Sequence, residues 1–220
     1  MTSDNITVIM KPTNQCNLRC KYCYHADNGY DKEKMTDQVL EKAIAVTAPF
    51  FKRVEYNWHG GEPLIMGLDF YERVLYYQKK YRQGPEHHII NTMQTNGILI
   101  TQETAEFIKK YGFGIGLSFD GPFNDQTRGK TDYTLNAYDL LKQIDKRHGT
   151  ISVIGAHNIH NLIDIYKYFN EKNINKNIVV PMNLVDTYDI PFVHPGDLLN
   201  VVFFNSMIQN GVKLIKKFSL

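Results

Sequence analysis

Cysteine is scarce in this sequence and confined to one place. The 220 residues contain three cysteines, Cys16, Cys20 and Cys23, all within the stretch NQCNLRCKYCYHAD. An odd number of cysteines so closely spaced suits ligands on one loop better than disulfide bridges. In a reducing compartment, clustered thiols of this kind more often hold a metal or carry out redox chemistry than form bridges.

The sequence also lacks long apolar runs and an excess of one charge. No apolar stretch approaches the ~18 residues that suggest a membrane span, and no charged-then-apolar leader opens the chain. The 25 basic and 23 acidic residues leave a formal charge of +2, without the basic stripe of a nucleic-acid-binding protein. We therefore expect a soluble cytoplasmic protein with no nucleic-acid or membrane partner.

Short apolar segments alternate with amphipathic helical segments along the chain. Strands are predicted at residues 5–10, 53–59, 87–94, 113–119, 150–156 and 177–183. Helices are predicted at residues 36–48, 69–81, 101–112, 134–148 and 161–170, with a last helix from about 195. Six strand–helix units in succession imply a parallel sheet with helices packed outside it. Because eight units close a barrel, the expected α/β fold is a partial, six-unit, TIM-like barrel in a single domain, residues 1–220.

The unusual residues fall where the predicted strands end. The cysteines follow the first strand, and HGGEP, TNG, SFDGP, AHN and PMN follow the next five in order. In parallel β/α folds, the loops at the C-terminal ends of the strands form the working surface. Two polar residues there are expected to be structural: His59 packs or forms hydrogen bonds, and Asp120 shapes its turn.

Three thiolates on one loop can bind three irons of a cubane cluster. A four-iron cluster normally takes four cysteines, so one iron would stay open to another molecule. Zinc bound by the three cysteines and His25 is an alternative, although paired zinc ligands are more often two residues apart and a second pair is missing. A coincidental group of reduced cysteines is the other alternative.

The stretch CNLRCKYC, with Tyr22 before the third cysteine, resembles the signature of radical S-adenosylmethionine (AdoMet) enzymes. The resemblance extends to WHGGEP at residues 58–63, QTNG at 94–97 and SFDGP at 118–122, followed by Arg128. These motifs resemble the anaerobic sulfatase-maturase branch, which groups with the peptide-modifying SPASM enzymes. The resemblance extends over about residues 5–185, and the motifs follow one another in the same order as in this branch.

The resemblance implies a 4Fe–4S cluster on Cys16, Cys20 and Cys23, with AdoMet chelating the open iron. The residues implied to bind AdoMet are Tyr22 at the adenine, Gly60, Gly61 and Glu62 at the methionine end, Ser118 and Arg128 at the carboxylate, and Asn183 at the nucleoside. Glycine lets backbone approach a ligand closely, and the arginine fork suits a carboxylate.

The implied reaction is reductive cleavage of AdoMet to a 5′-deoxyadenosyl radical, which takes a hydrogen atom from a peptide or protein side chain. A flavodoxin- or ferredoxin-type partner would supply the electron. Two alternatives stay open. One is an enzyme that acts on a small molecule or activates a glycyl-radical enzyme, and the other is an inactive remnant that binds a cluster and AdoMet. Maturases of this branch carry a cysteine-rich C-terminal domain with auxiliary clusters. No cysteine follows Cys23, so we expect that domain to be absent. Because the first predicted strand begins at residue 5, we also expect no leader-binding module in front of it. No residue of this sequence is then assigned as the catalytic acid or base.

Overall fold

The computed structural model describes residues 4–23, 32–144, 148–155, 158–172, 174 and 177–181. The chain divides into two compact units, one of Met1–Ser118 with Asn124–His148 and one of Phe119–Phe123 with Gly149–Leu220. The single domain expected over residues 1–220 stays a prediction. Within the described ranges, no helix combines the length and the apolar character needed to cross a bilayer.

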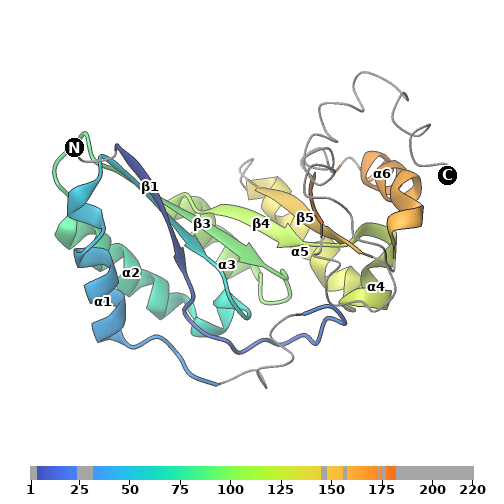
Figure 1. Ribbon diagram of the computed structural model, residues 1–220, viewed down its shortest axis with the longest axis horizontal. Coiled ribbons are helices and arrows are strands. Elements are labelled where there is room, and N and C mark those ends of the chain that lie inside the picture. Colours follow the sequence, from blue (N-terminus) through green and yellow to red (C-terminus); the bar gives the residue numbers. More distant parts are fainter. Residues whose placement is uncertain are drawn as a thin grey trace, which may run out of the picture. The chain divides into compact units, whose positions relative to one another are not determined.

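A parallel sheet forms the centre of the first unit (Figure 1). Its strands β1 (Asn5–Met10), β2 (Arg53–Trp58), β3 (His88–Thr95) and β4 (Gly114–Ser118) lie side by side in chain order. Met10 pairs with Trp58, which in turn pairs with Met93. The C-terminal ends of the strands therefore lie along one edge of the sheet, as the sequence predicts.

The helices of the first unit are α1 (Asp37–Ala45), α2 (Leu68–Tyr81), α3 (Gln102–Tyr111), α4 (Asn124–Thr127) and α5 (Thr131–Ile144). Short 3₁₀ turns are η2 (Ala48–Phe50) and η3 (Pro63–Met66). Two of these helices have capped ends: the Thr36 hydroxyl accepts a hydrogen bond from the Val39 N–H at the start of α1, and Gly112 is the C-cap residue of α3. α1 ends at Ala45, before the predicted stop, and Pro49 lies within η2.

Strand β2 shows how the sheet is buried. Val54, Tyr56 and Trp58 are fully buried, while the intervening residues are partly accessible, so the alternation in the sequence marks the two faces. The Trp58 ring meets Phe70 and Tyr71 of α2 edge to face, with centroids 5.8 and 5.7 Å apart. Such aromatic pairs contribute about 0.5–1.5 kcal/mol each beyond the area they bury. Helix α2 is thereby fixed on one face of the sheet.

The second unit contains η4 (Gly121–Phe123), β5 (His148–Ile154), η5 (Ile159–Asn161), α6 (Leu162–Glu171) and β6 (Asn177–Pro181). Strands β5 and β6 pair in parallel, and Phe119 packs edge to face on Phe169 of α6, with centroids 5.8 Å apart. The Asp120 carboxylate is buried and accepts a hydrogen bond of 2.9 Å from the Val153 N–H, in line with the expected structural role.

Two element predictions between residues 119 and 149 are wrong. The helix predicted to continue to residue 148 ends at Ile144, and β5 already begins at His148. The segment DKR that follows Ile144 has no apolar position with which to continue the buried face of the helix. Between the strand predicted at residues 113–119 and the helix predicted at 134–148, where no element is predicted, the structure contains the short helix α4. The helix predicted from about residue 195 lies outside the described residues.

Candidate functional site

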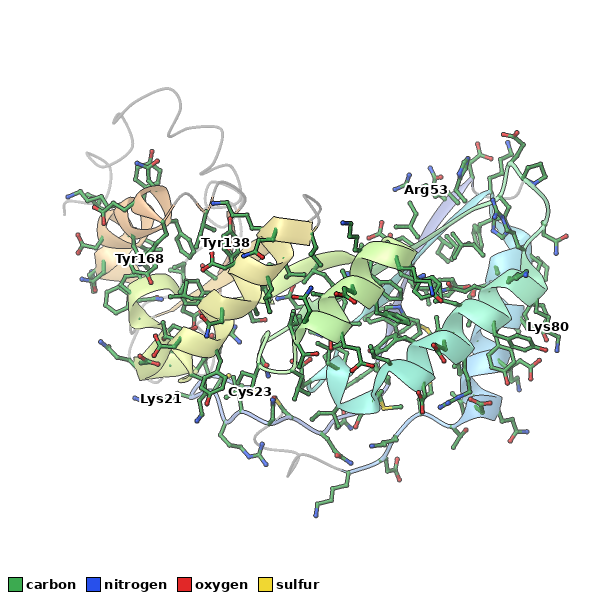
Figure 2. All side chains as sticks on the ribbon, turned by 180° about the vertical axis from the view of Figure 1, so that it is seen from behind. Lys21, Cys23, Arg53, Lys80, Tyr138 and Tyr168 are labelled. Carbon is green, nitrogen blue, oxygen red and sulfur yellow. The ribbon has the colours of Figure 1, made fainter. Side chains whose placement is uncertain are left out.

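The cysteine loop, residues 11–23, follows β1 and runs along the edge where the strands of the first unit end. Near its end, the Lys21 N–H donates a hydrogen bond of 2.9 Å to the Thr127 carbonyl at the end of α4. Figure 2 shows Lys21 and Cys23 near α4 and far from Arg53, where β2 begins. The cysteines thus lie at the C-terminal edge, as predicted from the order of the motifs.

The first half of the cysteine loop is bound to the GGEP loop, residues 60–63, by backbone hydrogen bonds. The Gly61 N–H donates to the Thr13 carbonyl at 3.0 Å, and the Glu62 N–H donates to the Gln15 carbonyl at 2.7 Å. Backbone pairs of this kind do not depend on side-chain identity. The cysteine loop is therefore held in place up to the residue before Cys16.

The two glycines of the GGEP loop are required by this packing. Gly60 has a φ of +124°, and a Cβ there would lie 2.7 Å from the Lys11 Cγ. A Cβ on Gly61 would lie 2.6 Å from the Asn14 carbonyl oxygen. We expect these glycines to face AdoMet, and the structure adds that they are in close contact with the cysteine loop itself.

Glu62 joins two loops from inside the protein. Its side chain is buried, and its carboxylate accepts hydrogen bonds from the Leu64 N–H at 3.0 Å, the Thr95 hydroxyl at 2.7 Å and the Asn96 N–H at 2.8 Å. Burial raises the pKa of this carboxyl above its ordinary value, and the three donors oppose that change. Glu62 therefore fixes the TNG loop, residues 95–97, next to the GGEP loop.

Asn96 connects the TNG loop to the first cysteine. Its Nδ2 lies 3.8 Å from the Cys16 Sγ and 2.7 Å from the Asn17 Oδ1, and the Leu18 N–H also donates to the Cys16 Sγ at 3.4 Å. Burial raises the pKa of the Cys16 thiol, while the Leu18 N–H opposes that rise. Asn96 is not among the predicted site residues. Its position directly after β3, at the edge where the site is expected, is the feature of the sequence that could have indicated it.

Arg128 approaches the second cysteine. Its Nη1 lies 3.8 Å from the Cys20 Sγ, and its guanidinium carbon lies over the Tyr22 ring, 5.2 Å from the centroid. A cation over an aromatic face is an attractive arrangement. The structure thus brings together Tyr22 and Arg128, two residues predicted separately from the sequence.

Ser118, at the end of β4, is held by Gln94, which belongs to the QTNG motif but is not among the predicted site residues. The Gln94 side-chain amide donates a hydrogen bond of 2.7 Å to the Ser118 Oγ. Because the amide N–H can only donate, the serine oxygen accepts here and its own hydrogen can be donated to another group. A hydroxyl whose hydrogen is available for donation suits an anionic ligand such as a carboxylate.

His59 has the hydrogen-bonding role expected for it. Its Nδ1 accepts a hydrogen bond of 2.7 Å from the Gly60 N–H, so the neutral ring carries its proton on Nε2. Burial lowers the pKa of His59, and the charge of Lys11 acts in the same direction. Asn183 and His25, the other predicted ligands, lie outside the described residues.

Hydrogen-bond donors lie close to the sulfurs of Cys16 and Cys20. Within the described parts of the chain, no three His, Cys, Asp or Glu side chains gather as ligands of one metal ion. A cubane does not need such convergence, because each thiolate binds a different iron. The three cysteines form no disulfide with one another and are partly accessible, and N–H donors approach the sulfurs of Cys16 and Cys20. Donors of this kind stabilise thiolate charge.

Comparison with known proteins decides the family. Residues 10–180 match the model of the Radical SAM superfamily. The chain belongs to this superfamily. It is 36% identical over 180 residues to a serine-type anaerobic sulfatase-maturating enzyme of Bacteroides thetaiotaomicron, over 74% of this chain and 43% of that protein. It is 31% identical over 183 residues to a cysteine-type anaerobic sulfatase-maturating enzyme of Clostridium perfringens strain 13, over 76% of this chain and 49% of that protein.

The structural comparison agrees. The solved structure of native anSMEcpe with bound AdoMet and Cp18Cys peptide matches with a TM-score of 0.77 at 25% identity, over 93% of this chain and 61% of that chain. The chain spans about half the length of the curated relatives it matches. These findings confirm the predicted resemblance, the α/β fold of a partial barrel, and an enzyme of radical chemistry whose cofactors are a 4Fe–4S cluster and AdoMet. The individual ligand residues stay predictions.

Proposed function

We propose that this chain is the radical core of an enzyme that modifies a peptide or protein side chain. The cluster and AdoMet supply an electron and a 5′-deoxyadenosyl radical that removes a hydrogen atom from the substrate. The proposal depends chiefly on one observation: the chain matches sulfatase-maturating enzymes through the strands and loops that surround its cysteines. A related structure with a bound peptide supports the substrate class.

Cys16, Cys20 and Cys23 would each bind one iron and leave the fourth open. The open iron is the place for the amino and carboxylate groups of AdoMet. The backbone bonds between the GGEP loop and the cysteine loop would hold the Cys16 end of this site before any cofactor arrives. Such preorganisation matters because the ligand geometry must be accurate.

The AdoMet methionine group would meet complementary charges at the same edge of the sheet. Ser118 can donate its hydroxyl hydrogen to the carboxylate, and Arg128 offers two parallel donors for the same anion. The buried Asn14 Oδ1 has no donor among the described residues, and Asn14 contacts Gly61 through its backbone. An ammonium group, which only donates, is the kind of partner that such an oxygen needs. Tyr22, beneath the Arg128 guanidinium, would lie at the adenine.

The remaining partners are proposed on chemical grounds. Cleavage of AdoMet needs a low-potential one-electron donor, for which a flavodoxin- or ferredoxin-type protein is the expected class. Reduced, clustered thiols suit the cytoplasm, where glutathione and thioredoxin keep cysteines reduced. The near-balanced charge gives no support for a nucleic-acid partner.

Cofactor cleavage tests the enzymatic part of the proposal. The protein is reconstituted anaerobically with iron and sulfide, given dithionite and AdoMet, and assayed for 5′-deoxyadenosine. We expect four irons per chain and 5′-deoxyadenosine, with both lost in the Cys20→Ala variant. A four-iron cluster without 5′-deoxyadenosine would indicate an inactive binding module, and zinc binding without a cluster would refute the proposal.

Substrate class is tested separately. Peptides encoded beside the gene and peptides with the cysteine or serine of a sulfatase site are incubated with the reconstituted protein and analysed by mass spectrometry. A mass change that requires AdoMet supports peptide modification. Cleavage of AdoMet without a mass change in any peptide, but with turnover of a small molecule, would contradict it.

A further inference from the structure

Asn96 has the geometry of a donor to a cluster ligand. Its side chain is almost fully buried, and its Nδ2 lies 3.8 Å from the Cys16 Sγ. The other Nδ2 hydrogen is directed at the Asn17 Oδ1, 2.7 Å away. Both hydrogens of the amide therefore have an acceptor on the cysteine loop.

The orientation of the Asn96 amide follows from its surroundings. The Ile98 N–H lies 3.0 Å from the Asn96 Oδ1. A backbone N–H can only donate, so the side-chain atom next to it must be the oxygen. The nitrogen is then the atom that faces Cys16. If the amide were turned over, the Ile98 N–H would face another N–H group.

The backbone of Asn96 is held from both sides, so the amide cannot easily move away. The buried Glu62 carboxylate accepts from its N–H at 2.8 Å, and the Thr134 hydroxyl donates to its carbonyl at 3.0 Å. Gly97 packs tightly, because a Cβ there would lie 3.0 Å from the Leu117 Cδ2. Glu62 and Thr134 thus position Asn96 without touching the thiol.

Hydrogen bonds to cluster sulfurs are one of the means by which proteins set the potential of an iron–sulfur cluster. A reduced cluster carries one more negative charge than the oxidised one, and a donor near a thiolate stabilises added negative charge. A donor to Cys16 should therefore favour the reduced cluster, which is the form that reacts with AdoMet.

We propose that the Asn96 side-chain amide donates an N–H···S hydrogen bond to the Cys16 thiolate of the bound cluster and thereby raises the reduction potential of that cluster. In the step concerned, the oxidised cluster gains one electron from a low-potential donor, which is oxidised, and no bond to Asn96 is made or broken. The proposal rests on the proposed function, since it requires a cluster on Cys16. Asn96 acts here as a positioning residue that tunes the site.

The test is a redox titration of the reconstituted cluster, without AdoMet, followed by electron paramagnetic resonance. The variant Asn96→Leu keeps the number and branching of the side-chain heavy atoms but removes the donor. We expect the ratio of reduced to oxidised cluster at a fixed potential to fall about tenfold, which is about 59 mV for a one-electron couple. If Asn96→Leu does not take up four irons, Asn96→Ser is titrated in its place, because its short hydroxyl cannot reach the sulfur.

A matched control separates the hydrogen bond from general damage to the loop. Thr104→Val removes a buried hydroxyl that donates to the Leu99 carbonyl in the same connection between β3 and α3 but does not hold Asn96, so its potential should equal that of the wild type. An unchanged potential in the Asn96 variants, or an equal change in Thr104→Val, would overturn the proposal while the proposed function stands. A wild-type protein that takes up no four-iron cluster would instead refute the proposed function.

A direct measurement covers the case in which neither Asn96 variant holds a cluster. Wild-type protein made with asparagine labelled by ¹⁵N in the side chain is reduced and examined by electron–nuclear double resonance. A ¹⁵N coupling to the cluster supports the N–H···S bond, and its absence overturns it.

Discussion

The two halves of the cysteine loop are held in different ways. Residues 11–16 are joined to the GGEP loop by backbone hydrogen bonds and by glycines that leave no space for a side chain. Residues 20–23 contact Thr127 through the Lys21 N–H and contact the Arg128 side chain through Cys20 and Tyr22. The first half therefore depends on close backbone packing, whereas the second depends on a charged side chain that we also expect to bind AdoMet.

Substitutions in the two halves should therefore have different effects. Damage to the first half should disturb folding, and the cluster should be lost as a result. Damage to the second half should leave the cluster in place and weaken AdoMet binding. Four predictions test the comparison, beginning with the largest expected effect.

Gly61→Ala should be the most damaging change. The new Cβ would lie 2.6 Å from the Asn14 carbonyl oxygen, and backbone cannot move away as a flexible side chain can. We expect the free energy of unfolding to fall by roughly 3 kcal/mol, the upper end of the usual cost of overpacking, and four-iron uptake to be lost. Denaturant unfolding and iron analysis measure these effects.

Gly84→Ala is the control for Gly61→Ala. Gly84 has a φ of +97° and open space around it, so alanine there should cost only the backbone strain of about 1–2 kcal/mol and keep the cluster. Normal stability and iron content in Gly61→Ala would show that the first half is not tightly packed.

Glu62→Gln should destabilise the cluster-free protein in a pH-dependent way. The glutamine Nε2 cannot accept from the Asn96 N–H, and an unpaired buried donor costs about 1–3 kcal/mol. Burial raises the pKa of Glu62 above 4.5. The folded state therefore binds the proton more tightly than the unfolded chain, and the stability gained from protonation is lost as the pH rises through the raised pKa.

The difference in the free energy of unfolding between wild type and Glu62→Gln should accordingly shrink as the pH rises above 4.5 and through the raised pKa of Glu62. Denaturant unfolding at a series of pH values measures the difference. A difference that grows with pH would mean that the hydrogen bonds, which favour the charged carboxylate, outweigh burial.

Arg128→Lys should weaken AdoMet binding about tenfold while cluster content stays normal. Lysine keeps the charge but not the planar fork that binds a carboxylate through two parallel bonds. Equilibrium binding to the reconstituted protein measures the affinity. Arg73→Lys, the same substitution at an exposed ion pair with Asp37, should change nothing. Loss of the cluster in Arg128→Lys would remove the distinction between the two halves.

Gln94→Leu should have the smallest effect, because it touches neither half of the loop. Ser118 would lose the donor that orients its hydroxyl. From the net free energy that one such hydrogen bond contributes, we expect the affinity for AdoMet to fall about threefold. Thr92→Val, two residues earlier on the same face of β3, removes a hydrogen bond to Glu55 and should leave the affinity unchanged. An equal loss in both variants would indicate a general effect on the strand.

Local patterns predicted most of the described fold. Alternating burial in β2, the Thr36 cap and the Gly112 end of α3 all depend on neighbours within a few residues, so the sequence contains their signals. The end of α5 and the presence of α4 were predicted wrongly, because a short polar segment carries little periodicity.

The candidate site was predicted in part. The motifs CNLRCKYC and HGGEP pointed to Cys16, Cys20, Gly61 and Glu62, which the structure places at one edge of the sheet. The QTNG motif contains Gln94 and Asn96 but assigned no role to either, since no sequence pattern marks the partner of a side-chain amide. Glu62 shows what sequence alone does not predict. The sequence shows that it is polar and lies beside a turn, whereas its burial and the three hydrogen bonds that its carboxylate accepts depend on β3 lying next to β2.

The sequence alone determined the order of strands and helices and the chemistry of the loop, because periodicity and cysteine spacing are properties of neighbouring residues. Tertiary structure alone decided which donors reach which thiol. Asn96 and Cys16 are 80 positions apart in the chain, and Arg128 and Cys20 are 108 apart. Contacts over such separations exist only because the parallel register brings the C-terminal ends of β1 to β4 to a common edge.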